Sequence, residues 1–172
     1  ARVIRSCGRL ADKGLRFQLV ICGDGANQDV LKRLARHHLG ESVHFAGRIP
    51  RDQMPHYYRC ADIFVFPGIQ EGLGMVYLED QAAGLPVVAC AGWGASEVVR
   101  HNETGLLSAP GDWPQFTHHI MRLLMDGDLR HRMGNAATRH IACHHNLHIN
   151  YKHLERQLTH LARMSFYETP SN

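Results

Sequence analysis

The sequence contains no apolar run close to the roughly 20 residues that a membrane-spanning helix needs. Its first five residues lack the apolar segment of a secretory signal peptide, so we expect no leader here. The chain starts with Ala rather than Met, a pattern expected of a fragment. The composition, 44% hydrophobic and 20% charged, is that of a soluble globular protein, and 172 residues suggest one domain.

Paired cysteines and metal-ligand clusters are also lacking. None of the five cysteines has C-x-x-C spacing, and most have apolar neighbours, so we expect reduced, mainly buried thiols. This pattern favours a cytoplasmic protein, free or at the cytoplasmic membrane face. Among the 14 histidines, His144, His145 and His148 could meet at helical spacing, with only Cys143 beside them. A solvated helix explains this segment better, and we predict no metal site.

The net charge of +3 is small, and the basic residues are scattered along the chain. A protein that binds nucleic acid would gather them on one face, so we predict no nucleic-acid partner. A weak peripheral attraction to an anionic membrane or to phosphate groups stays open.

Short apolar runs alternate with segments of helical periodicity. We expect strands at residues 17–22, 43–46, 63–66, 87–90 and 105–107. We expect helices at residues 4–12, 27–38, 51–60, 74–83, 95–99, 113–125, 129–140 and 150–164. The alternation predicts an α/β fold, a Rossmann-like parallel sheet with helices on both faces, whose first strand is buried on both faces. The domain should span residues 1–165, followed by a loose tail over 166–172.

Residues 71–79 suggest a ligand site. Gly72 and Gly74 precede a predicted helix, and glycine lets a backbone approach a ligand closely. The first amides of a helix lack internal partners and lie at its positive end, which suits a diphosphate. Glu79, about one and a half turns into the helix, could accept hydrogen bonds from both ribose hydroxyls. Glu71 lies before the helix, where a sugar beyond the phosphates could reach it. An ordinary glycine-rich turn has the same spacing.

The glutamates fit the E-x7-E pattern of retaining glycosyltransferases with the GT-B fold, and the chain resembles glycosyltransferase family 4. Further motifs follow in the family's order over nearly the whole chain. They are Gly-Asp-Gly at 23–25, Phe-x-Gly at 45–47, Tyr-x-x-Ala-Asp at 58–62, Ala-x-Gly-x-Pro-Val-Val at 82–88, Gly-x-x-Glu-x-Val at 94–99 and Thr-Gly-Leu-Leu at 104–107.

The resemblance implies the C-terminal, donor-binding domain of a GT-B enzyme. Such an enzyme would transfer a hexosyl group, with retention of configuration, from a nucleotide diphosphate sugar to a glycan or lipid-linked acceptor. The resemblance implies that Glu71 is the catalytic residue, in contact with the transferred sugar, and it assigns the ribose to Glu79. The remaining donor-binding positions that it implies are Gly23, Gly47, Arg48 (near the base), Gly72, Leu73, Gly74, Met75 and Val76.

The resemblance also implies which partners the chain needs. No metal or other cofactor is expected, because the helix dipole and basic side chains would stabilise the departing diphosphate. An N-terminal acceptor domain of the same full-length enzyme is the expected partner, and the isolated chain is expected to be inactive.

Residues 8–14 copy the Gly-Arg-Leu-x-x-x-Lys-Gly segment whose Arg and Lys contact the diphosphate in that family. The family has a full helix between this segment and the next strand, whereas here only a turn fits. We therefore interpret residues 4–12 as the end of that helix, which makes Arg9 and Lys13 a chance match, although the alternative stays open. Two positions depart from the family pattern: Gly68 replaces the usual Ser, and Asp80 the usual Ala.

Two other functions fit a related fold. A sugar-nucleotide 2-epimerase would use carboxylates and histidines from two domains, but the order of motifs favours the transferase. A non-catalytic nucleotide-sugar-binding domain would have no need of the intact pair Glu71 and Glu79.

Overall fold

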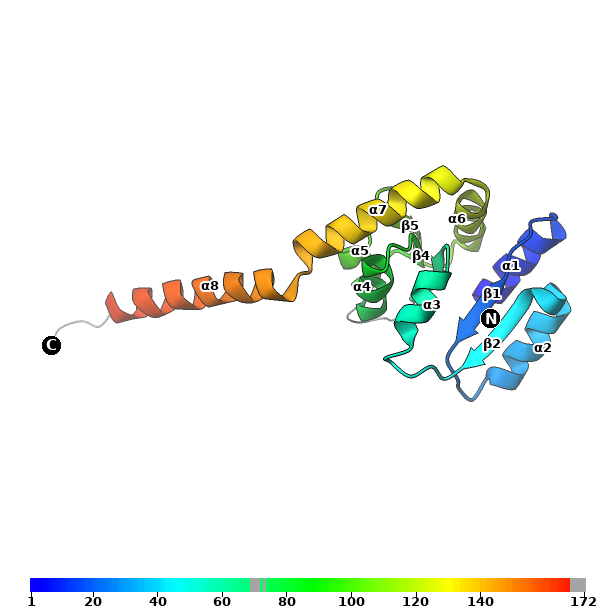
Figure 1. The fold of residues 1–172 in the computed structure, drawn as a ribbon, viewed down its shortest axis with the longest axis horizontal. Helices are drawn as coiled ribbons and strands as arrows, with labels where there is room; N and C mark the ends of the chain where they lie inside the picture. The colour runs from blue at the N-terminus through cyan, green and yellow to red at the C-terminus, as the bar shows by residue number, and fades with distance from the viewer. Residues whose placement is uncertain (69–71, 73, 168–172) are drawn as a thin grey trace.

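The computed structural model describes residues 1–68, 72 and 74–167. Helices and strands alternate along the chain (Figure 1). The strands are β1 (Leu19–Cys22), β2 (Val43–Gly47), β3 (Phe64–Val65), β4 (Val87–Cys90) and β5 (Gly105–Ser108). The helices are α1 (Arg2–Asp12), α2 (Gln28–Leu39), α3 (Met54–Cys60), α4 (Met75–Ala82), α5 (Trp93–Val98), α6 (Trp113–Met125), α7 (Gly127–His144) and α8 (Leu147–Tyr167), with a 3-10 turn, η1, at Gly40–Ser42.

Every strand pair is parallel, as predicted. The described strands form two sheets, β1–β2 and β3–β4–β5, joined through α3. In the first sheet Leu19 pairs with Val43, and in the second Val88 pairs with Leu106. Parallel neighbours need a crossover connection, and helices supply it here. The predicted α/β fold is confirmed.

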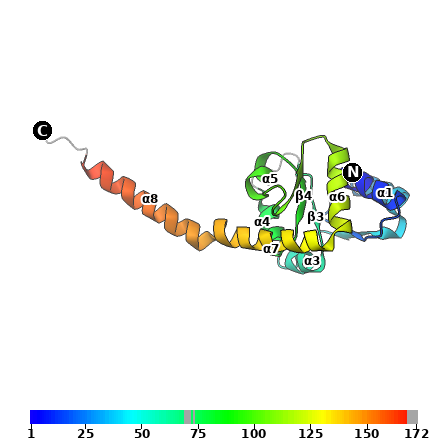
Figure 2. The ribbon, with the colours of Figure 1, turned by 90° about the horizontal axis from the view of Figure 1, so that it is seen from above.

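The central strand β4 shows why helices cover both faces of its sheet. Its four residues are all buried, and their side chains alternate between the faces. Val88 and Cys90 belong to a core cluster with residues of α1, α6 and α7, whereas Val87 and Ala89 pack with residues of α4 and α5. Burial of each valine contributes about 1.5–3 kcal/mol, and Figure 2 shows the helices around this strand.

Strand β1 differs from the prediction, because only one of its faces is buried. Leu19 and Ile21 pack against the cluster that α1 and α2 build. On the other face Val20 is 44% exposed and Cys22 is also exposed. This face is more exposed than the other, so the expectation of burial on both faces was wrong.

The cysteines are free, as predicted, but most of them are not buried. Cys7 and Cys90 lie in the core, while the other three are exposed at Cys22, Cys60 and Cys143. Cys60 is the last residue of α3, and Cys143 lies in the last turn of α7. An apolar neighbour in the sequence therefore did not report burial for these residues.

The C-terminal helices are longer than expected and are separated at Asn146. Its Oδ1 atom accepts hydrogen bonds from the amides of His148 (3.0 Å) and Ile149 (3.2 Å), which caps the start of α8. Helix α8 extends away from the rest of the chain (Figures 1 and 2). Its apolar stripe is exposed at Tyr151, Leu154, Leu158 and Leu161. Within the described part of the chain, every helix is too short or too polar to cross a membrane.

Candidate functional site

The carboxyl ends of β1 and β2 meet, as expected for the ligand-binding edge of a parallel sheet. The Gly23 amide donates a hydrogen bond of 2.7 Å to the Gly47 carbonyl oxygen. Both glycines have a positive φ, 123° and 70°, and so turn the chain where a residue with a Cβ would be strained. Arg48 follows directly and is exposed. The structure thus brings three predicted site residues together.

Helix α4 begins where the sequence predicted an anion site. Gly74 is its N-cap, with φ 63°, and a Cβ there would lie 2.7 Å from the Gly94 carbonyl oxygen. Only glycine fits such a turn against the start of α5. The amides of Met75 and Val76 open the helix, where no residue four positions earlier offers an intrahelical partner. Gly72 is exposed just before them.

Two of the predicted site residues, Glu71 and Leu73, lie outside the described residues. The assignment of Glu71 to the transferred sugar therefore stays a prediction from the resemblance.

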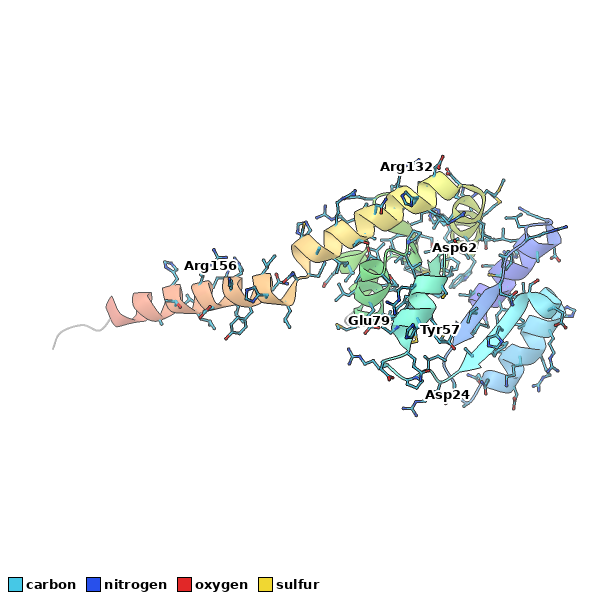
Figure 3. The ribbon with its side chains drawn as sticks, viewed as in Figure 1. Asp24, Tyr57, Asp62, Glu79, Arg132 and Arg156 are labelled. Carbon is cyan, nitrogen blue, oxygen red and sulfur yellow. The ribbon has the colours of Figure 1, made fainter. Side chains whose placement is uncertain are left out.

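Glu79 lies on α4 and faces both α3 and the segment that leads into α3 (Figure 3). Its Oε2 atom accepts a hydrogen bond of 3.2 Å from the Tyr58 hydroxyl. Its Oε1 atom lies 3.6 Å from the Arg51 guanidinium. The Glu79 side chain is 37% exposed and the Arg51 side chain 87% exposed, so solvent screens this ion pair. The carboxylate is accessible and already has one ordered partner.

The Tyr58 hydroxyl keeps its proton and so can donate a hydrogen bond. Burial raises its pKa, and the charge of Glu79 and the hydrogen bond to that carboxylate raise it further. Sequence reasoning placed Tyr58 in a family motif without a role at the site, and it missed Arg51. The only available signal was the position of both residues in the segment that follows β2.

Asp80 follows Glu79 on α4 but is completely buried, with 0% exposure. Among the described residues, neither of its carboxyl oxygens has a hydrogen-bond partner. Burial raises its pKa well above the ordinary value, and the nearby Gln81 amide offsets only part of this rise. These surroundings disfavour the charged form of Asp80, whereas the Glu79 side chain is partly exposed.

Gly68, another departure from the family pattern, is explained by its contact with Tyr77. Gly68 has φ 61°, and a Cβ there would overlap the Tyr77 hydroxyl. That hydroxyl donates a hydrogen bond of 3.2 Å to the Phe66 carbonyl oxygen. The buried tyrosine thereby ties α4 to the end of β3.

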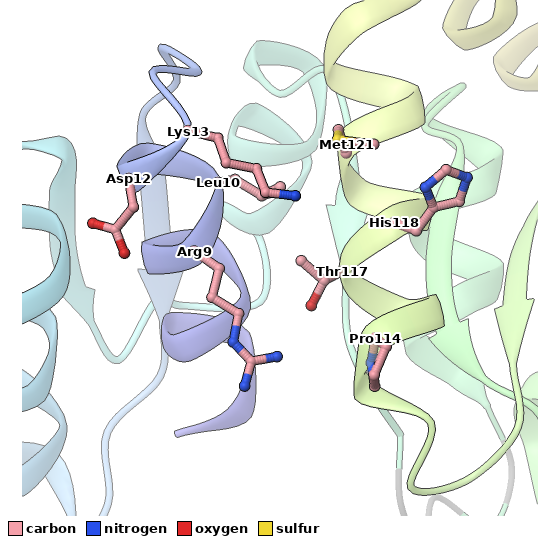
Figure 4. A pocket seen from close by; sticks show the side chains of 8 residues that line it. All are labelled: Arg9, Leu10, Asp12, Lys13, Pro114, Thr117, His118 and Met121. Carbon is pink, nitrogen blue, oxygen red and sulfur yellow. The ribbon is translucent and has the colours of Figure 1, made fainter.

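Arg9 and Lys13 do not lie at the ligand-binding edge of the β1–β2 sheet. Helix α1 ends at Asp12 with Lys13 as its C-cap, which confirms the helical interpretation of residues 4–12. The chain then enters β1 at its amino end, so the two cations lie near the opposite edge from Gly23. They line an open groove of about 430 Å³ between α1 and α6 (Figure 4). The geometry does not bring them together with Glu79.

The histidine-rich end of α7 holds no metal-binding cluster within the described part of the chain. The ring centroids of His140 and His144 lie 4.8 Å apart, and those of His140 and His145 5.3 Å apart. Burial lowers the pKa of both His140 and His145, with smaller contributions from neighbouring cations. These rings pack against one another at the end of α7.

Comparison with known proteins defines the class to which this fold and this site belong. Residues 1–140 match the family described as glycosyl transferases group 1. The chain belongs to this family.

Individual relatives agree with this assignment. The chain is 39% identical over 127 residues to a GDP-mannose-dependent alpha-(1-6)-phosphatidylinositol monomannoside mannosyltransferase of Mycobacterium tuberculosis. The match covers 69% of this chain and 33% of the relative. The chain thus spans about a third of the length of the curated relatives it matches.

Solved structures share the fold. The C-terminal domain of a glycosyl transferase group 1 protein, LpcC, from Francisella tularensis has a TM-score of 0.75 at 23% identity. That match covers 85% of this chain and 78% of the other. HepE of Anabaena in complex with UDP has a TM-score of 0.77 at 22% identity, over 92% of this chain and 44% of the other. The fold is therefore that of a glycosyltransferase domain.

Proposed function

We propose that this chain is the donor-binding domain of an enzyme that transfers a hexosyl group, with retention, from a nucleotide diphosphate sugar to a glycan or lipid-linked acceptor. Family membership and the name of the mannosyltransferase relative support the reaction class. The UDP complex of HepE supports a nucleotide ligand. GDP-mannose is the first donor to test, because the M. tuberculosis relative is named as dependent on it.

One observation carries the proposal. Glu79 presents a partly exposed carboxylate on the same helix whose N-terminal amides are offered by Met75 and Val76. A helix N-terminus suits a diphosphate, and a carboxylate beside it suits the ribose hydroxyls. Gly47 and Arg48, beyond β2, would lie near the base.

Several parts of the proposal lie outside the described residues. Glu71 would contact the transferred sugar, and an acceptor domain would be supplied by the rest of a longer enzyme, as the threefold length of the relatives suggests.

No metal would be needed, so a chelator should leave transfer by the full-length enzyme unchanged. The five free thiols support a cytoplasmic location, with weak contact to a membrane face.

The donor role can be tested on the chain itself. Calorimetric titration with GDP, UDP, ADP and their hexose conjugates should show binding of at least one nucleotide. Glu79→Gln should weaken it about tenfold or more, because hydrogen bonds to a charged acceptor are each worth about 1.5–3 kcal/mol. Glu155→Gln on the projecting helix α8 is the matched control and should bind like the wild type. Binding that is unaltered in Glu79→Gln would refute the ribose role.

The stereochemical part needs the full-length enzyme. Proton NMR of the glycoside product reports the anomeric configuration directly. A product with the configuration of the donor supports retention, and an inverted product refutes it.

A further inference from the structure

Tyr58 and Glu79 are 21 positions apart in the sequence, and their side chains form a contact between two helices. The tyrosine comes from α3 and the glutamate from α4. Tyr58 is 6% exposed, and its ring makes an edge contact with Phe64 at 6.1 Å between centroids. Packing therefore fixes the hydroxyl, and the hydroxyl in turn restrains a glutamate that would otherwise sample several rotamers.

The two oxygens of Glu79 have different surroundings. Oε2 accepts the tyrosine hydrogen bond at 3.2 Å, inside a partly buried contact. Oε1 lies 3.6 Å from Arg51, whose side chain is 87% exposed. An exposed pair at that distance holds a side chain only weakly. The tyrosine is thus the ordered partner, and a carboxylate with one such partner keeps lone pairs free for two further donors.

We propose that Tyr58 is a positioning residue that holds the Glu79 carboxylate in the orientation needed to accept both ribose hydroxyls of the donor nucleotide. This inference rests on the proposed donor-binding function. It assigns affinity to a residue that need not touch the ligand, because a restrained carboxylate loses less freedom on binding.

The inference makes a quantitative statement about affinity. Tyr58→Phe keeps the ring and removes only the donor, so the nucleotide should bind about three- to tenfold more weakly. Tyr57→Phe is the matched control, because no hydrogen bond of the Tyr57 hydroxyl occurs among the described residues. In this variant Tyr58 keeps its hydrogen bond to Glu79. Arg51→Gln should change the affinity less than twofold, because its ion pair is exposed.

Positioning can be separated from packing by a change in the ligand. A 2′,3′-dideoxynucleoside diphosphate offers no hydroxyl to Glu79. Wild type and Tyr58→Phe should therefore bind this analogue equally, although they differ for the ribonucleotide. Likewise, Tyr58→Phe should have no further effect in the Glu79→Gln background, where the carboxylate is already gone.

The test is calorimetric titration of the 172-residue chain and these variants with GDP, UDP and ADP, then with the dideoxy form of the tightest binder. Weaker ribonucleotide binding in Tyr58→Phe, with equal dideoxy binding, supports the inference. Ribonucleotide binding like that of Tyr57→Phe overturns it while leaving the donor role of Glu79 intact. An equal loss for both ligands overturns it in favour of packing. A wild-type chain that binds no nucleotide overturns the proposed function, and this inference with it.

Discussion

Replacing Asp80 by alanine should stabilise the folded chain. The side chain is 0% exposed, and neither carboxyl oxygen has a hydrogen-bond partner among the described residues. A buried polar group without a partner costs about 1–3 kcal/mol. Alanine also has the higher helix propensity, by up to about 0.7 kcal/mol. The cavity left by a carboxyl group, roughly 30 Å³, costs about 0.7 kcal/mol in return. Where the acid is protonated in both the folded and the unfolded state, the expected net gain is about 1–3 kcal/mol.

The gain should depend on pH, and its sign follows from the raised pKa of Asp80. Below the ordinary value of 3.8 the acid is protonated in both states and contributes no pH dependence. Above that value the unfolded chain releases the proton while the folded chain retains it. The free energy of unfolding of the wild type then falls by up to about 1.4 kcal/mol per pH unit relative to Asp80→Ala, until the folded pKa is reached.

Urea denaturation followed by circular dichroism at pH 5, 6 and 7 measures both effects. The difference between Asp80→Ala and wild type should be positive and should widen as the pH rises above the ordinary pKa of 3.8. Asp80→Asn is the matched variant: it keeps the buried polar group but cannot ionise, so its pH dependence should parallel that of Asp80→Ala. A difference that does not change with pH would refute the raised pKa of Asp80, and a less stable alanine variant would refute the missing hydrogen-bond partner.

Three further predictions concern other parts of the structure, and urea denaturation checks each. Gly74→Ala should lower the free energy of unfolding by at least about 2 kcal/mol, because its backbone has a positive φ and its Cβ would press on the Gly94 carbonyl; an unchanged value would contradict this geometry. The double change Leu154→Gln and Leu158→Gln should alter stability by less than about 0.5 kcal/mol, since both side chains are more than half exposed on α8; a large loss would show that α8 packs on the domain. Asp126→Ala should cost about 1 kcal/mol, because its carboxylate caps α7 through a 2.8 Å hydrogen bond, and Asp126→Asn should restore most of that loss.

The elements with the clearest local signals were predicted most closely from the sequence. The observed bounds of β4 and α6, Val87–Cys90 and Trp113–Met125, are those expected. The strand is a continuous apolar run between Pro86 and a small-residue loop. The helix has an Asp112 cap, whose carboxylate accepts the Gln115 amide at 2.9 Å, and Pro114 in its first turn. Both signals are local, so no tertiary contact was needed to interpret them.

The burial of individual strand faces was predicted less well than the fold itself. The apolar run that ends in Cys22 was expected to be covered on both faces, but burial depends on what packs against a strand. Val20 faces away from the cluster that Leu19 and Ile21 join, and it is 44% exposed. The end of α7 also differed, because the helix continues past the expected end at His140 to His144.

The candidate site divides along the same line. Gly23, Gly47 and Gly74 were predictable because a positive φ favours glycine, which can be recognised in the sequence. The contact of Tyr58 with Glu79 has no such local signal, since it joins two helices whose relative placement follows from packing.

The two adjacent carboxyl groups on α4 show how sharp this limit is. Successive residues on a helix point about 100° apart, so Glu79 and Asp80 are neighbours in sequence but lie in different environments. Glu79 turns toward α3 and solvent, where Tyr58 and water stabilise its charge. Asp80 turns inward, where burial raises its pKa. The E-x7-E motif identifies Glu79 as the ligand-binding acid only by analogy with the family. The surroundings of each carboxyl group determine which one can present a charge to a ligand.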